Sequence, residues 1–189
     1  LFRQQLNELE NKALRSQMNP HFIFNSLNSI NSYIIKNKTD EASAFVTKFA
    51  RLIRLILDNS MESSVLLEKE LMALNLYIEI ENKRFENKFT WQIEVDPELD
   101  TGHLLVPPMV IQPYVENAIW HGLLHKDSPG MLSISLQSRN GFIEIEIKDD
   151  GVGREAAIDL RSKASLKTQS HGLDVTAKRI KNFNRDTIE

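Results

Sequence analysis

Residues 132–153 read LSISLQSRNGFIEIEIKDDGVG, and this stretch decides the fold of the second half of the chain. Apolar residues occupy every second position from 132 to 136 and again from 143 to 147. A period of two turns one side of each segment toward a core, as in a half-buried strand. Asn140-Gly141 lies between the two segments and is a strong short-range signal for a tight turn. The stretch therefore predicts an antiparallel β-hairpin.

The hairpin runs directly into Asp149-Asp150-Gly151-Val152-Gly153. A carboxylate is thereby placed at the end of a strand, and the two glycines allow the backbone to bend and to approach a flat ligand closely. A buried carboxylate that accepts from an exocyclic amine would select adenine over guanine. Taken alone, these five residues fit a surface turn better, so the nucleotide interpretation depends on the rest of the chain.

Other elements surround this hairpin. Alternating apolar residues from Trp91 to Val95 predict another strand. One helix is expected from about Pro113 to His121, with proline suited to its first turn, and another from Gly172 to about Asn184. Together these elements predict an α/β sandwich over residues 90–189, in which helices cover one face of an antiparallel-rich sheet.

The first 89 residues have the spacing of helices. Apolar positions three or four residues apart predict two amphipathic helices joined by a turn at 37–40, and a third helix after a polar break at 59–64. The apolar stripe of the first helix consists of Ile23, Leu27, Ile30 and Ile34.

We expect residues 1–66 to form a helical hairpin and residues 67–89 to form a linker helix. Two hairpins would bury their stripes against each other as a dimeric four-helix bundle. In the alternative, a monomer docks the stripe on its own second domain. With the sandwich of residues 90–189, the fold class is α+β.

The first candidate site is the stretch QMNPHFIFNSLN at residues 17–28. Its polar side chains share one helical face away from the apolar stripe, and they are Gln17, His21, Asn25, Asn28 and Ser32. Pro20 has no N–H group, so it should kink the helix beside His21. A neutral imidazole on such a solvent-exposed face is a competent nucleophile near neutral pH. A lone surface histidine nevertheless has no function in most proteins.

The second candidate site is Glu116-Asn117-Ala118-Ile119-Trp120-His121-Gly122. Asn117 and His121 are four residues apart, so they face the same way on a helix. An amide oxygen is a hard ligand suited to Mg²⁺, which keeps several waters and bridges phosphates. His121 and Glu116 could contact phosphate or orient a water on the metal. The alternative is an ordinary helix end with its tryptophan packed on the sheet.

The third candidate site is Ser170-His171-Gly172-Leu173. The N–H groups at the start of this helix would form an anion site. The preceding polar stretch contains Arg154, Arg161, Lys163 and Lys167 and could close over a triphosphate as a lid. A solvated surface loop is an equally good interpretation of that stretch.

Composition excludes several classes of protein. The chain has 189 residues and no cysteine, which excludes disulfides and thiol catalysis. A formal net charge of −3 gives no electrostatic reason to expect nucleic-acid binding. No apolar run approaches the roughly 20 residues that a membrane span needs. The chain begins at Leu1 without a signal-peptide pattern, so we interpret it as a fragment whose upstream part is missing.

In their order and spacing these segments resemble the LytS/YehU-type sensor histidine kinases over nearly the whole chain. The matching segments are residues 17–28 for the phosphoacceptor box, 67–71 and 77–85 for the linker helix, 107–117 for the N box, 149–153 for the first glycine box, and Gly172-Leu173 with Arg179 for the second. The resemblance implies a Bergerat-type ATP site, the fold that gyrase, Hsp90 and MutL share in the GHKL group.

The resemblance also implies roles for individual residues. His21, with Asn25 in the same box, would accept the γ-phosphoryl group of ATP. Asn117 would bind Mg²⁺ and Asp149 would read adenine. The rest of the nucleotide site would consist of His121, Gly151, Gly153, Gly172 and Leu173.

The resemblance further implies partners and a location. The kinase would act as a homodimer and pass the phosphoryl group to an aspartate of a response regulator, often a LytTR-type transcription factor. We expect the cytoplasmic portion of a bacterial inner-membrane protein, linked to the membrane only through the missing N-terminal segment. No nucleic-acid partner is expected.

The sequence departs from the family pattern at several positions. Phe22 follows the histidine where many histidine kinases place an acidic base, so the base is open and Glu116 is a candidate. Trp120 stands where a basic residue is common, and Ser170 replaces the first glycine of the second box. The family continues past Glu189 into a glycine-containing strand pair, so the sheet is expected to be incomplete. A nucleotide-binding module without autophosphorylation and a GHKL-type ATPase are the alternative functions.

Overall fold

The fold is known from a computed structural model that describes residues 20–153 and 170–188. Its elements are α2 (Pro20–Ile35), α3 (Thr39–Ser60), β1 (Val65–Leu66), α4 (Leu67–Arg84), β2 (Phe89–Val95), β3 (Leu105–Val106), α5 (Gln112–Asn117), the π-helix η1 (Ala118–Gly122), the 3₁₀-helix η2 (Leu123–His125), β4 (Gly130–Arg139), β5 (Phe142–Asp149) and α7 (Ser170–Ile188). The predicted kink before His21 and the predicted lid both lie outside the described residues.

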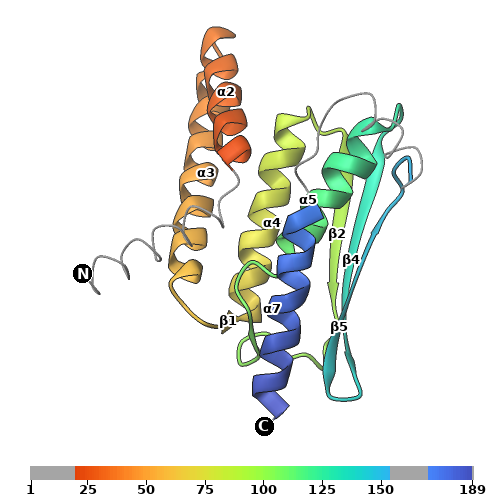
Figure 1. Cartoon of the computed structure of the whole chain (residues 1–189). Coiled ribbons are helices and arrows are strands. Elements are labelled where there is room, and N and C mark those ends of the chain that lie inside the picture. The colour runs from red at the N-terminus through yellow and green to blue at the C-terminus, as the bar shows by residue number, and fades with distance from the viewer. Residues whose placement is uncertain (1–19, 154–169, 189) are drawn as a thin grey trace.

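A three-stranded sheet in the order β2-β4-β5 forms one layer, and α4, α5 and α7 cover one of its faces (Figure 1). The predicted hairpin is confirmed, because β4 and β5 pair antiparallel around Asn140 and Gly141. Both turn residues have positive φ, 52° and 80°, as a two-residue hairpin turn with the twist of the strands requires.

The expectation of an antiparallel-rich sheet is wrong for one of its two strand pairs. β2 runs parallel to β4 over the whole of β2. Parallel neighbours need a long crossover connection, and the segment between Val95 and Gly130, which includes α5, provides it. A second, two-stranded sheet formed by β1 and β3 was not predicted.

Helix α4 is the central helix of the molecule. Leu67, Leu74, Tyr77 and Ile78 of this helix are at most 1% exposed. On one side α4 packs against α3, and on the other it faces the sheet (Figure 1). The mixed α/β architecture predicted from the two periodicities is therefore confirmed.

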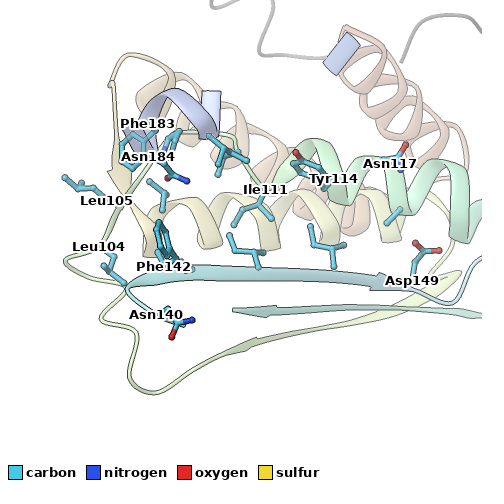
Figure 2. Close-up of a pocket in the computed structure, with 18 of the residues that line it drawn as sticks. Leu104, Leu105, Ile111, Tyr114, Asn117, Asn140, Phe142, Asp149, Phe183 and Asn184 are labelled. Carbon is cyan, nitrogen blue, oxygen red and sulfur yellow. The ribbon is translucent and has the colours of Figure 1, made fainter. Parts of the chain in front are cut away.

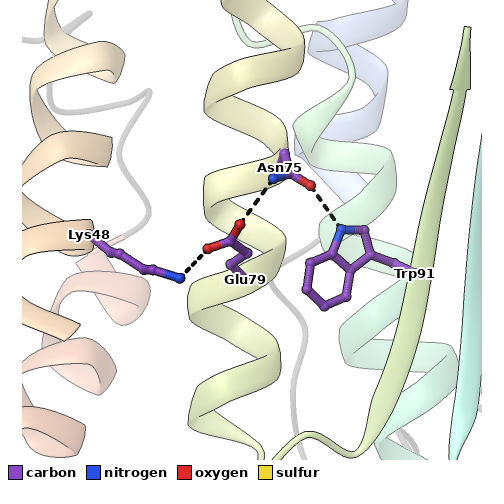
Figure 3. A network of polar contacts seen from close by, with 4 residues as sticks. All are labelled: Lys48, Asn75, Glu79 and Trp91. Atoms are coloured by element: carbon purple, nitrogen blue, oxygen red, sulfur yellow. Dashed lines mark hydrogen bonds and ion pairs between the residues drawn. The ribbon is translucent and has the colours of Figure 1, made fainter. Parts of the chain in front are cut away.

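A chain of polar contacts joins α3, α4 and β2 (Figure 3). Lys48 Nζ lies 2.5 Å from Glu79 Oε2, and the Asn75 amide donates to Glu79 Oε1 at 3.1 Å. The Trp91 indole N–H in turn donates to Asn75 Oδ1 at 2.9 Å. These groups are only partly buried, so their contacts contribute little to the stability of the fold. We infer that they mainly fix how the three elements are placed relative to one another.

Helices α2 and α3 are joined by a short turn, as the predicted helical hairpin requires. Phe22 is buried, and its ring centroid lies 5.2 Å from that of Tyr77 and 6.0 Å from that of Phe49. The residue after His21 therefore anchors α2 on α3 and α4. This packing gives a structural reason for an aromatic residue at a position where many histidine kinases have an acid.

The predicted single stripe of α2 is wrong, because the helix has two apolar faces. One face packs inward through Phe22 and Ile30. Leu27 and Ile34, which the prediction placed on the same stripe as Ile30, are 49% and 59% exposed. The docking of α2 on α4 resembles the monomer alternative, yet among the described residues none covers Leu27 and Ile34 of the second face fully.

Among the described helices, none combines the length and the hydropathy that crossing a bilayer requires.

Candidate nucleotide cleft and phosphoacceptor

A cleft with a volume of about 950 Å³ lies between β5 and the helices that cover it. Ile143, Ile145 and Ile147 form its floor, and Ile111 and Tyr114 stand opposite them. Other apolar side chains close one end, namely Leu104, Leu105, Phe142 and Phe183 (Figure 2). Its size and apolar floor fit a drug-sized flat ligand such as a nucleotide.

The other end of the cleft is polar. Asn117 and Asp149 face it from α5 and β5, respectively (Figure 2). His121 and Gly153 also line the cleft. Four of the residues assigned from the sequence are thus brought together from two segments, 117–121 and 149–153. Asn117 and His121 both reach the cleft although the helix changes from α to π after Asn117, a change that was not predicted.

Close backbone contact holds this end of the cleft together. A Cβ atom added to Gly151 would lie 2.3 Å from the carbonyl carbon of Gly122, and one added to Gly122 would lie 2.3 Å from Asp149 Oδ1. From the sequence, we expected Gly151 to allow the close approach of a ligand. In the structure, glycine is required at this position because the backbone of Gly122 comes close to it. Gly153 has φ of +80° and open space around it, so its backbone conformation is what favours glycine.

The two adjacent acids have different surroundings. Asp150 accepts from the Met131 N–H at 2.7 Å and pairs with Lys126 at 2.7 Å, and the lysine lowers its pKa. Asp149 lines the cleft and accepts from the Gly151 N–H at 3.0 Å. The expectation that Asp149 is buried is wrong, because the side chain is exposed at the mouth of the cleft. The glycines beside it have no side chains that could cover it.

His21 lies on the surface, as the polar face of its helix predicts. The amide nitrogen of Asn25 lies 3.0 Å from its Nε2 atom. An amide nitrogen can only donate, so Nε2 accepts and the neutral ring carries its proton on Nδ1. The ring also packs against Trp120, with the two centroids 5.1 Å apart. The phosphoacceptor candidate therefore meets the same short helical segment that lines the cleft.

Glu116 is half-buried and does not line the cleft. Its charge acts instead on a cluster formed with Tyr77, Glu81 and Arg84 of α4. Glu81 is fully buried and forms an ion pair with Arg84. Burial raises the pKa of Glu81 to about 7, which Arg84 opposes and Glu116 reinforces.

The segment assigned to the second glycine box lies at the start of α7. Helix α7 begins at Ser170, so Gly172 lies in its first turn, and Leu173 is not among the described residues that line the cleft. Arg179 donates from Nη2 to the carbonyl of Pro108 at 2.8 Å. This arginine therefore fixes the loop before α5, and in the described structure it is not part of the cleft lining.

That loop is held from the other side by Glu70. Its Oε2 accepts from the N–H of Met109 at 2.8 Å, and its Oε1 accepts from those of Val110 and Ile111 at 2.9 and 3.2 Å. The carboxylate is 2% exposed, and Met109 has φ of +57°. A buried anion on α4 thus stabilises a strained turn that leads directly into the helix bearing Asn117.

Comparison with known proteins gives the same relationship as the motifs. The family model described as Histidine kinase matches residues 9–89. The Sensor protein LytS of Staphylococcus haemolyticus (strain JCSC1435) is 30% identical over 184 residues, which are 97% of this chain and 30% of that protein. The chain belongs with the LytS-type sensor histidine kinases. The resemblance stated from the motifs is thereby confirmed.

Two further relatives match most of this chain. Sensor histidine kinase YpdA of Escherichia coli (strain K12) is 34% identical over 163 residues, or 86% of this chain and 28% of that protein. The putative uncharacterized protein YwpD of Bacillus subtilis (strain 168) is 32% identical over 183 residues, or 95% of this chain and 64% of that protein. This chain therefore spans less than a third of the LytS and YpdA relatives.

Sequence reasoning missed the buried acids of α4. Glu70 and Glu81 are separated from Leu67, Leu74 and Ile78 by three or four residues, so they lie on the apolar face of α4. An acid on an apolar stripe is the signal that could have identified both, because a charge is buried only with partners. The role of Trp120 as a contact for His21 carries no such signal.

The buried Glu81 should make the stability of this protein depend on pH. The unfolded chain loses this proton near pH 4.5, whereas the folded state keeps it to about pH 7. The stabilisation from this group is therefore complete below pH 4.5 and is lost as the pH rises to 7, by up to about 3 kcal/mol. Urea unfolding between pH 4.5 and 7.5 should show this loss in the wild type and a smaller one in Glu81→Gln.

The exposed Glu94 provides the matched control, since Glu94→Gln should keep the pH dependence of the wild type. Burial also raises the pKa of Glu70 and adds a slope of the same sign, but this slope is common to all three proteins. Identical slopes for the wild type and Glu81→Gln would show that Glu81 is ionised in the folded protein throughout this range.

Proposed function

We propose that this chain is the core of a two-component sensor histidine kinase that transfers the γ-phosphoryl group of ATP to His21. One observation carries the proposal: the helical segment 117–121 lines the cleft through Asn117 and His121 and contacts the His21 ring through Trp120. A nucleotide site and a nucleophile thus meet on two faces of one short segment. For such a reaction, positioning and charge stabilisation supply most of the catalysis.

ATP would lie in the cleft with adenine at the polar carboxylate of Asp149, consistent with a Bergerat-type site. Asn117 offers one amide oxygen, so a magnesium ion there would take its other ligands from phosphate oxygens and water. When bound, that ion neutralises charge on the transferring phosphoryl group. Of the assigned residues, His121 and Gly153 border the same cleft and are suited to phosphate and backbone contacts.

In the proposed step, an imidazole nitrogen of His21 forms a bond to the γ-phosphorus, and the bond between that phosphorus and the ADP oxygen breaks. The other ring nitrogen then releases its proton. Glu116 is a candidate acceptor, because it lies four residues before Trp120, the residue whose ring contacts His21. An aspartate of a response regulator, of the LytTR type in our proposal, would then receive the phosphoryl group.

Dimerisation through the helical hairpin is part of the proposal. Large apolar side chains are exposed along both helices at helical spacing: Phe24, Leu27, Ile34 and Ile35 on α2, and Val46 and Leu57 on α3. A surface of this kind on a monomer usually marks an interface. Two hairpins that bury these side chains would form the expected four-helix bundle.

The test of this function is a labelling experiment with ATP that carries the label on its γ-phosphate, in the presence of Mg²⁺. We expect label on the protein that is lost in acid and kept in alkali, the behaviour of phosphohistidine. Steady phosphate release without labelled protein would instead favour a GHKL-type ATPase. Binding of ATP with neither outcome would favour a nucleotide-binding module that does not phosphorylate itself.

A further inference from the structure

The ring of Trp120 forms a platform for the imidazole of His21 within a single chain. The two ring centroids lie 5.1 Å apart, with an angle of 52° between the planes. The indole is held by Arg84, the last residue of α4, and by Phe85, which follows α4. The Phe85 ring meets the indole edge-on, with the centroids 5.5 Å apart, and the Arg84 guanidinium lies 4.9 Å from the indole centroid. The platform is therefore fixed by neighbouring groups.

His21 is also fixed from its own helix. Asn25, one turn further along α2, lies 3.0 Å from Nε2 and sets the orientation of the ring. Phe22 is 7% exposed and anchors this turn of α2 on Tyr77 of α4. Because α4 holds both Phe22 and Trp120, it sets where the imidazole and the indole meet.

We propose that Trp120 is a positioning residue that holds the His21 of its own chain beside the nucleotide cleft, so that phosphoryl transfer runs within one chain. This inference rests on the proposed kinase function. Trp120 is followed directly by His121 and preceded by Asn117 at three residues, and both line the cleft. At about 1.5 Å of rise per helical residue, both positions lie within about 5 Å of Trp120 along the axis.

Transfer between chains would require the partner's imidazole to replace one already in place. It would have to displace the chain's own His21 from an indole that neighbouring groups hold. A basic residue at position 120, as is common in the family, could not provide the same ring contact. Trp120, which departs from the family pattern, therefore has a role in positioning His21.

Mixed dimers test the direction of transfer. One chain carries His21→Ala and the other carries Asn117→Ala, with different affinity tags so that only the mixed dimer is purified. We expect no label on either chain, because neither has both an intact cleft and an imidazole. Label on the Asn117→Ala chain, at half or more of the rate per intact site, would overturn the inference.

A second mixed dimer controls for activity. It pairs a wild-type chain with a chain carrying both substitutions, and we expect label on the wild-type chain alone. Absence of label on the wild-type homodimer would instead reject the proposed kinase function, so the two failures are distinguishable. If the protein proves monomeric, a labelling rate per chain that is independent of concentration supports transfer within one chain, and a rate that rises with concentration overturns it.

The role of Trp120 is tested with Trp120→Ala and the matched variant Trp120→Phe. We expect the labelling rate to fall about tenfold or more in Trp120→Ala, with the KM for ATP within about twofold of the wild type, since misplacement of a reacting group slows chemistry without weakening binding. Trp120→Phe keeps an aromatic platform and should recover most of the rate. An unchanged rate in Trp120→Ala would overturn the positioning role.

Proton NMR of the histidine rings provides a signature that general destabilisation would not produce. The ring current of the indole should shift the imidazole protons of His21 in the wild type, and Trp120→Ala should remove this shift. His103, whose side chain is 87% exposed, should keep its resonances in all variants. Unchanged His21 resonances in folded Trp120→Ala would show that the two rings do not meet in solution.

Discussion

Replacement of His21 by alanine is expected to abolish protein labelling by ATP completely while leaving the fold intact. The imidazole is exposed, so its removal leaves no cavity, and within its own helix the substitution breaks the hydrogen bond with Asn25. Surface replacements of this kind usually change stability by less than about 0.5 kcal/mol. The chemical consequence is total, because the nitrogen that would accept the phosphoryl group is removed.

His103→Ala is the matched control for this experiment. It removes another exposed imidazole, which pairs with Asp100 on the loop before β3 and does not line the cleft. We expect wild-type labelling from this variant and none from His21→Ala, with equal melting temperatures for both. Residual acid-labile label in His21→Ala would place the phosphoacceptor elsewhere and remove the basis for the proposed transfer.

The parts of the fold that local patterns determine could be predicted. The two-residue turn at Asn140-Gly141 sets the β4–β5 pairing, and the alternation of apolar residues sets which face of β4 is buried. Asn117 and Asp149 were assigned to one site because their segments resemble the N box and the first glycine box of one family. Both line the cleft, as the assignment requires.

The parts that failed depend on contacts between distant segments. The direction of β2 against β4 follows from a long crossover, and no local signal in β2 distinguishes a parallel from an antiparallel neighbour. The exposure of Leu27 and Ile34 depends on which of two apolar faces α4 covers. The sequence around Gly151 fits a flexible ligand loop equally well, and only the fold shows that Gly122 of η1 approaches it closely.

Replacement of Glu70 by alanine is expected to destabilise the protein by about 3 to 5 kcal/mol, more than replacement of an exposed acid of α4. Three buried N–H groups, those of Met109, Val110 and Ile111, would lose a charged acceptor at once. Arg179 would also lose the anion that its charge faces across this loop. Chemical denaturation at pH 6 measures the loss.

Two variants on the same helix separate this effect from a general loss of negative charge. Glu68→Ala removes an exposed acid two residues earlier and should cost less than about 0.5 kcal/mol. Glu70→Gln keeps one acceptor oxygen for two of the three N–H groups but turns an amide donor toward the third, so we expect a loss of about 1 to 2 kcal/mol.

Hydrogen exchange shows whether the loss is local to the loop that leads into α5. In Glu70→Ala, under conditions where the protein stays folded, the amides of residues 109–111 should exchange faster than those of the β4–β5 ladder. Equal acceleration everywhere would mean that Glu70 only contributes to global stability. Selective acceleration would mean that Glu70 of α4 holds the turn that leads into the helix bearing Asn117.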